Sequence, residues 1–122
     1  MKLNFSSDVP IYLQITQSIE DDILKGIFEE ETQIPSTTEI SINYKVNPAT
    51  VAKGFSLLTA SGIIYKKRGV GMFVFKGAKE VLLEKRRGIF YETYISRLLE
   101  EAKRLQISTD DIVSMIERGG NQ

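Results

Sequence analysis

Two signals that start helices stand close together in the middle of the chain, and their spacing constrains the fold more than any other feature. Ser36 is followed three residues later by Glu39, the capping-box arrangement in which a hydroxyl and a carboxylate each bind a free amide of the first turn. Asn47 is a good N-cap, and Pro48 suits the first helical position. Between the two signals there is room only for a short helix and a turn, which is the spacing of a helix-turn-helix.

An amphipathic helix is predicted ahead of these signals. We expect it to begin with Pro10 at its first position, with Ser7 or Asp8 as its cap, and to end at Gly26. Its apolar residues recur every four positions: Ile11, Ile15, Ile19 and Ile23. This repeat predicts one buried face along the whole helix.

The two helices that follow differ in length. The one after Ser36 is short and is expected to bury Ile40 and Tyr44. The one after Asn47 is expected to end at Gly62. Its apolar face consists of Val51, Phe55 and Leu58. Its other face is free to meet a partner.

After Gly62 the apolar period changes to that of strands. Residues 63–65 (IIY) and 72–75 (MFVF) form two β-prone runs, separated by the sequence KKRGVG. The glycines permit a tight turn, and the three cations are expected to project from the base and tip of the hairpin. A basic hairpin directly after a helix-turn-helix predicts a wing. The expected fold is therefore α+β, a winged helix-turn-helix of three helices and a two-stranded wing.

Charge is distributed unevenly along a chain whose net charge is zero. Residues 20–39 contain seven acids and one lysine, whereas residues 40–79 contain no acid and seven cations: Lys45, Lys53, Lys66, Lys67, Arg68, Lys76 and Lys79. A long stretch with basic charge only is typical of a surface that meets phosphate. The alternative is a solvated lysine surface without a partner.

Composition argues against an enzyme. The 122 residues include no cysteine and no histidine, which removes thiolate chemistry, the usual general base and the commonest metal ligand. Adjacent carboxylates such as Asp110 and Asp111 do not face each other on a helix. We expect no cofactor and no metal. No apolar run is long enough to span a membrane and no signal peptide is recognisable, so a cytoplasmic location without membrane contact is expected.

The rest of the chain predicts a helical extension. We expect a DNA-binding domain at residues 1–76 and a two-helix dimerisation extension at residues 77–122, with a kink or break at Gly88 and a capped last helix at Ser108 and Asp111. The apolar stripe proposed for dimerisation comprises Phe90, Tyr91, Tyr94, Leu98, Ala102, Leu105, Ile112 and Ile116. The alternative is that these helices fold back on their own domain.

Four motifs resemble the GntR family of bacterial transcriptional regulators. They are PIYLQI at 10–15, IPS followed by Glu39, VNPATVAKGFSLL at 46–58 and GIIYKKRGVGMFV at 62–74. The short extension resembles the YtrA-type subfamily in particular. This resemblance implies a winged helix that binds DNA and a dimer formed through the extension.

The chain departs from the general family pattern where base contacts are expected. Many members carry arginines that read guanine edges, whereas this chain has Thr38, Pro48 and Ala52 at those positions, and only Lys53 is a long cation on the third helix. Base recognition is therefore expected to depend on smaller polar side chains and on DNA shape. The expected DNA-binding residues are Ser36, Thr37, Thr38, Lys45, Asn47, Pro48, Thr50, Lys53, Lys66, Lys67, Arg68, Gly69 and Gly71.

These observations predict a sequence-specific repressor that binds an inverted-repeat operator in double-stranded DNA as a homodimer. The alternative function is a winged-helix protein-interaction module that does not read DNA sequence; the basic wing argues against it, since protein interfaces are depleted of lysine. The sequence leaves open whether a small-molecule effector exists. The aromatic residues Phe90, Tyr91 and Tyr94 could line a pocket for one, or form part of the dimer interface.

Overall fold

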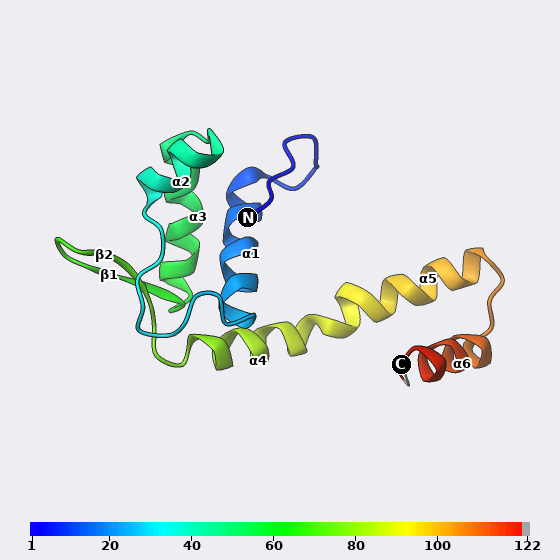
Figure 1. Cartoon of the computed structure of the whole chain (residues 1–122). Coiled ribbons are helices and arrows are strands. Elements are labelled where there is room, and N and C mark those ends of the chain that lie inside the picture. Colours follow the sequence, from blue (N-terminus) through cyan, green and yellow to red (C-terminus); the bar gives the residue numbers. More distant parts are fainter. Residues whose placement is uncertain (121–122) are drawn as a thin grey trace. The chain divides into compact units, whose positions relative to one another are not determined.

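The computed structural model describes residues 1–120, and the chain divides into two compact units, Met1–Glu84 and Lys85–Gln122. The elements are α1 (Ile11–Leu24), α2 (Thr37–Tyr44), α3 (Pro48–Ala60), β1 (Ile64–Lys67), β2 (Gly71–Val74), α4 (Ala78–Phe90), a π-helical segment η1 (Tyr91–Ile95), α5 (Ser96–Arg104) and α6 (Thr109–Gly120) (Figure 1). Three helices followed by a two-stranded antiparallel hairpin confirm the predicted winged helix-turn-helix. Among the described residues, no helix is long and apolar enough to cross a membrane.

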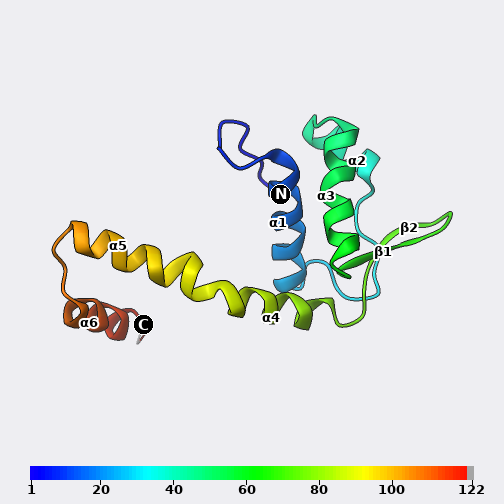
Figure 2. The ribbon, with the colours of Figure 1, turned by 180° about the vertical axis from the view of Figure 1, so that it is seen from behind.

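The core of the first unit lies between α1 and α3. The predicted stripes of both helices are buried: Ile15, Ile19 and Ile23 from α1, and Val51, Phe55 and Leu58 from α3. The two helices lie side by side and begin at the same end of the unit (Figures 1 and 2). The first turns of α1 lie beside the middle of α3, around Gly54.

Both predicted helix starts around α2 and α3 are confirmed. The Ser36 hydroxyl accepts a hydrogen bond from the Glu39 amide at 3.0 Å, and the Glu39 carboxylate accepts one from the Ser36 amide at 3.2 Å. The side chain of Asn47 accepts from the Ala49 amide at 2.8 Å, with Pro48 at the first helical position. These caps fix where the two helices of the helix-turn-helix begin.

The prediction that Tyr44 is buried is wrong, because 37% of its surface is exposed. Ile40 is buried as expected. The helix ends at Tyr44, and Lys45 adopts a left-handed conformation with φ of 54°. This turn sends Val46, rather than Tyr44, into the core.

The predicted start of α1 also needs correction. Pro10 is the N-cap rather than the first helical residue, and no side chain caps the helix. The Ser7 hydroxyl instead accepts from the Val9 amide at 3.1 Å in a local turn. The segment before the helix is held by Gln14, whose amide donates to the carbonyls of Asn4 and Val9, both at 2.9 Å.

The loop between α1 and α2, here called the acidic loop because it contains Glu29, Glu30 and Glu31, contributes a short extended segment that the sequence did not indicate. The Glu31 amide donates to the Val74 carbonyl at 2.8 Å, the Val74 amide donates to the Thr32 carbonyl at 3.1 Å, and the Ile34 amide donates to the Met72 carbonyl at 2.9 Å. Gln33 forms an isolated bridge with Phe73. The strand β2 is therefore hydrogen-bonded on both of its edges.

The first unit continues beyond the expected domain boundary at Lys76. Ala78 and Leu82 of α4 are completely buried in its core, which explains why the unit runs to Glu84. The start of α4 is also tied to the acidic loop, because the Glu30 carboxylate accepts hydrogen bonds from the amides of Gly77 at 2.8 Å and Lys79 at 3.1 Å. The hydrogen bond from Gly77, followed by that from Lys79, holds the pKa of Glu30 below its ordinary value of 4.5.

The second unit is helical and has little core of its own. Gly88 lies inside α4, so the predicted break there is wrong; the irregularity is the π-helical segment η1, three residues further on. The predicted cap of the last helix is confirmed, since the Asp111 amide donates to the Ser108 hydroxyl at 3.1 Å. Among the described residues of this unit, only Ala102 and Ile112 are buried.

Candidate nucleic-acid interface

The residues expected to bind DNA on α2 and α3 fall into two groups. The side chains of Ser36 and Asn47 are engaged as helix caps and fix the helix starts. The exposed residues are Thr38, Lys45, Asn47, Pro48 and Lys53, whereas Ser36, Thr37 and Thr50 are half-buried. The helix-turn-helix therefore presents a mainly small, polar surface with two lysines.

The expected facing of α3 agrees with the structure. Val51, Phe55 and Leu58 point into the core, and Lys53 lies on the exposed side. The Lys53 ammonium does not extend freely into solvent, however. It lies over the ring of Tyr12, 4.0 Å from the ring centroid, in a cation–π contact. Tyr12 belongs to the motif PIYLQI, but nothing in the sequence connected it with Lys53, since the two residues are far apart along the chain.

The hairpin of β1 and β2, here called the wing, has a first strand that extends beyond the predicted run 63–65. Lys66 and Lys67 lie within β1, opposite Met72 and Gly71, and not in the segment that connects the strands. Because side chains alternate along a strand, these two lysines lie on opposite faces of the wing. Only Arg68 of the three belongs to the turn.

Aromatic residues support one face of the wing. The ring centroid of Tyr65 is 6.0 Å from that of Phe73 and 4.6 Å from that of Phe75. The Lys67 ammonium lies 4.1 Å from the centroid of Phe73. This face therefore carries a cation on an aromatic surface, while Lys66 on the other face is exposed.

Two glycines shape the tip of the wing, as the sequence predicted. The Val70 amide donates to the Lys67 carbonyl at 3.0 Å, and Gly69 has φ of 79°, the positive value that the third position of a type II turn requires. Gly71 has φ of 148°, and a Cβ at this position would collide with the side chain of Gln33.

Gln33 is a further residue that sequence reasoning missed. Its side-chain amide donates to the Val70 carbonyl at 3.0 Å and so holds the tip of the wing against the acidic loop. The glutamine carries no charge and belongs to no recognisable motif. Only the pairing of the loop with β2 brings it to this place.

The seven cations of residues 40–79 fall into two groups according to where they lie. Lys76 and Lys79 lie beside Glu30 and contribute to lowering its pKa. The other five lie on the helix-turn-helix or the wing: Lys45, Lys53, Lys66, Lys67 and Arg68. All seven are exposed, and most of this positive charge therefore belongs to the two elements expected to meet DNA.

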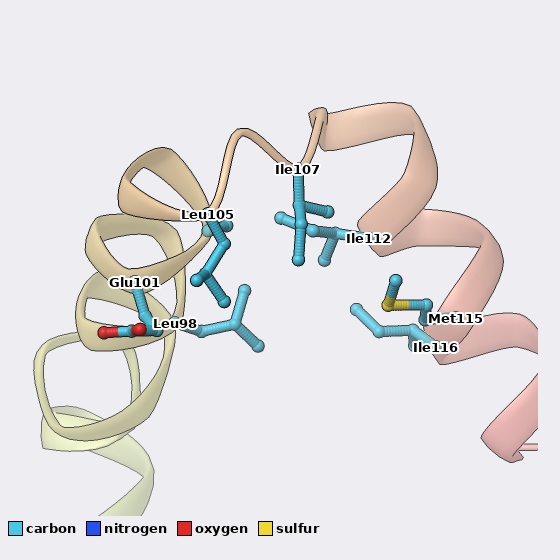
Figure 3. A pocket seen from close by; sticks show the side chains of 8 residues that line it. Leu98, Glu101, Leu105, Ile107, Ile112, Met115 and Ile116 are labelled. Carbon is cyan, nitrogen blue, oxygen red and sulfur yellow. The ribbon is translucent and has the colours of Figure 1, made fainter.

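Five of the eight residues expected to mediate dimerisation line an open apolar groove in the second unit: Leu98, Ala102, Leu105, Ile112 and Ile116. Leu98 and Leu105 near α5 and Ile112 and Ile116 of α6 lie on facing sides of it (Figure 3). Its volume is about 360 Å³, and Glu101, Ile107 and Met115 complete its lining. The rings of Phe90 and Tyr94 lie outside this groove, with centroids 5.4 Å apart, and both are exposed together with Tyr91.

Comparison with known proteins identifies the domain. Residues 11–74, more than half of the chain, match the model of the bacterial regulatory proteins of the gntR family. The chain is 38% identical over 78 residues to the HTH-type transcriptional repressor YtrA of Bacillus subtilis; this match covers 64% of the chain and 60% of that protein's length.

Solved structures of other transcriptional regulators are similar to this one. A putative transcriptional regulator of the GntR family from Bacteroides thetaiotaomicron is 37% identical, with a TM-score of 0.70 over 91% of this chain and 96% of that one. The DNA-binding domain of AraR in complex with the operator ORX1 is 26% identical, with a TM-score of 0.54 over 61% of this chain and 92% of that one. These matches agree with the expectation of a DNA-binding regulator rather than an enzyme. The helix-turn-helix, the wing and the matched family model together establish that this chain belongs to the gntR family of bacterial regulatory proteins.

Proposed function

We propose that this protein is a homodimeric transcriptional repressor that binds an inverted-repeat operator. The observation that carries the proposal is the placement of five exposed cations on the helix-turn-helix and the wing, within a domain of the gntR family. A cationic surface of this kind neutralises backbone phosphates, and the exposed Thr38 and half-buried Thr50 are available for base edges. The similar protein YtrA is named a repressor, which supports repression rather than activation of transcription.

The similar AraR domain supports the mode of binding, because its structure is that of a complex with an operator. This chain differs from arginine-rich readers by offering Thr38, Thr50 and Lys53 on its recognition surface. A single domain with few strong base contacts binds its site weakly, so two domains acting together are required for high affinity.

The second unit supplies the reason to expect a dimer. It exposes large apolar side chains over a helical segment that buries only Ala102 and Ile112 among its described residues. So small a core does not stabilise helices of this length in isolation. Residues 85–122 carry seven cations and six anions, so two copies are not kept apart by net charge. A second copy of the same unit is the occupant that we propose for the groove.

The proposal is tested by selecting binding sites from random duplex DNA with the full chain and measuring the mass of the free protein by light scattering. We expect recovered sites to contain two half-sites related by a two-fold axis, roughly 34 Å apart, and a free protein with the mass of a dimer. Recovery of no common sequence would contradict the proposed function. A monomer at micromolar concentration would contradict the proposed assembly.

A matched pair of variants locates the interface. Ile116 lines the groove and is 58% exposed, whereas Ile27 lies in a loop of the first unit and is 63% exposed. We expect Ile116→Glu to convert the dimer to a monomer, because the carboxylate would be buried in an apolar interface. Ile27→Glu should leave the dimer intact. Equal effects of both substitutions would argue against the groove.

A further inference from the structure

Tyr12, near the start of α1, and Lys53, near the middle of α3, form a contact between the two helices. The Lys53 ammonium lies 4.0 Å from the centroid of the Tyr12 ring. Lys53 is the only long cation on α3, so its position decides what positive charge the recognition helix offers to DNA. A lysine side chain otherwise samples many rotamers, and an aromatic face restricts it to one side.

The backbone beside this contact joins the two helices. Tyr12 is half-buried. The Thr16 hydroxyl lies 3.0 Å from the Tyr12 carbonyl and 3.0 Å from the Gly54 carbonyl, and its single proton is shared between these two acceptors. Thr16 therefore links the backbone of Tyr12 on α1 to the residue that follows Lys53 on α3.

The side of α3 on which the Lys53 ammonium lies decides whether it meets base edges or backbone phosphates. A recognition helix reads base edges with the face that points into the groove, whereas its flanks and the neighbouring helix meet the backbone that borders the groove. The ring holds the Lys53 ammonium on the α1 flank. We propose that Tyr12 is a positioning residue for DNA binding, which directs Lys53 to a backbone phosphate and away from base edges.

This proposal rests on the proposed function, and it changes the role expected for Lys53. A lysine that contacts a base discriminates between sequences, whereas a lysine that contacts a phosphate strengthens binding to all sequences. Thr38 and Thr50, together with the shape of the DNA, are then left to distinguish one sequence from another.

The test measures affinity against salt concentration for the full chain and the variants Lys53→Ala, Tyr12→Leu, Tyr12→Phe and Tyr12→Leu/Lys53→Ala. The probes are a duplex recovered by selection from random DNA and a scrambled duplex of the same composition. We expect Lys53→Ala to weaken binding to both duplexes by the same factor and to make the salt slope shallower by about 0.9. Tyr12→Phe keeps the ring face and should bind like the natural chain.

The effects of substituting Tyr12 and Lys53 on DNA affinity should not be additive. We expect Tyr12→Leu to weaken binding to both duplexes, and the double variant to bind no worse than Lys53→Ala alone. Thermal unfolding of each variant checks that it is folded at the temperature of the binding measurement. If Tyr12→Leu is not folded, Tyr12→Met replaces it, because methionine also removes the ring and fills an irregular apolar site, and the same loss of binding is expected of it.

Two results would overturn the inference. One is that Lys53→Ala weakens binding only to the selected duplex and leaves the salt slope unchanged, which would make Lys53 a base reader. The other is that a folded Tyr12→Leu variant binds both duplexes like the natural chain. A natural chain that prefers neither duplex would instead contradict the proposed function, while the salt slope on the scrambled duplex would still report on Tyr12 and Lys53.

Discussion

The hydroxyl of Thr16 donates a hydrogen bond to the backbone carbonyl of Gly54 at 3.0 Å and so joins α1 directly to α3. This approach is possible because residue 54 has no side chain. A Cβ built there would lie 2.8 Å from the carbonyl oxygen of Tyr12, closer than such contacts allow. The glycine thus sets the distance between α1 and α3.

Gly54→Ala should therefore destabilise the first unit by about 1 to 3 kcal/mol, because the backbone of α1 must move to admit the methyl group. Helix propensity alone predicts the opposite, a gain of about 1 kcal/mol. Gly88→Ala is the matched control, since Gly88 also lies within a helix but has open space around its Cα. Chemical denaturation should show reduced stability for the first variant and no reduction for the second. A more stable Gly54→Ala would show that the two helices are not in close contact.

Glu30→Gln should reduce stability at neutral pH and have no effect in acid. Since the folded-state pKa of Glu30 lies below 4.5, its ionised form contributes stability that is fully present above about pH 4.5. That contribution is lost as the pH falls through the lowered folded-state value. Thermal unfolding of both proteins across this range is the measurement. A difference in melting temperature that is the same at pH 7 and in acid would show that hydrogen bonding to a charged carboxylate is not the cause.

Replacing Lys66, Lys67 and Arg68 together with alanine should weaken binding to every DNA sequence. The slope of log affinity against log salt should become shallower by roughly 0.9 for each phosphate that the wing no longer neutralises. Lys25→Ala is the control, because Lys25 is an exposed cation at the end of α1 rather than on the wing. An unchanged slope in the triple variant would exclude the wing as an electrostatic contact.

A fragment of residues 1–84 should fold as a stable monomer that binds DNA weakly, whereas a fragment of residues 1–76 should be less stable by at least about 2 kcal/mol. The shorter fragment lacks Ala78 and Leu82 of the core and the amides of Gly77 and Lys79 that bind Glu30. Urea denaturation and light scattering of the two fragments provide the test. Equal stability would place the end of the domain at Lys76.

Features encoded locally were predictable from the sequence. The capping box at Ser36, the cap at Asn47 and the apolar repeats of α1 and α3 depend on residues a few positions apart, and the structure reproduces each of them. Contacts between distant segments were not predictable. Gln33 reaches the wing only because the acidic loop pairs with β2, and Tyr12 reaches Lys53 only because α1 and α3 lie side by side.

Errors in the prediction arise where a local rule competes with a tertiary contact. The sequence KKRGVG suggests a single turn, but the pairing of Lys66 with Met72 and Lys67 with Gly71 extends β1 through both lysines. Gly88 favours an interruption of the helix, yet a lone glycine is tolerated there at a modest cost, and the irregularity lies at η1 instead. The expected DNA-binding and dimerisation roles remain predictions, which the proposed binding and assembly experiments address.

The pairing of the acidic loop with β2 leaves β1 as the outer strand of the wing. An outer strand with unpaired backbone groups can recruit a strand from another molecule and start aggregation. Two of the four residues of β1 are lysines, and such charges on a free edge oppose the addition of a further strand. The cations of the wing thus help to keep the protein in solution even when no DNA is bound.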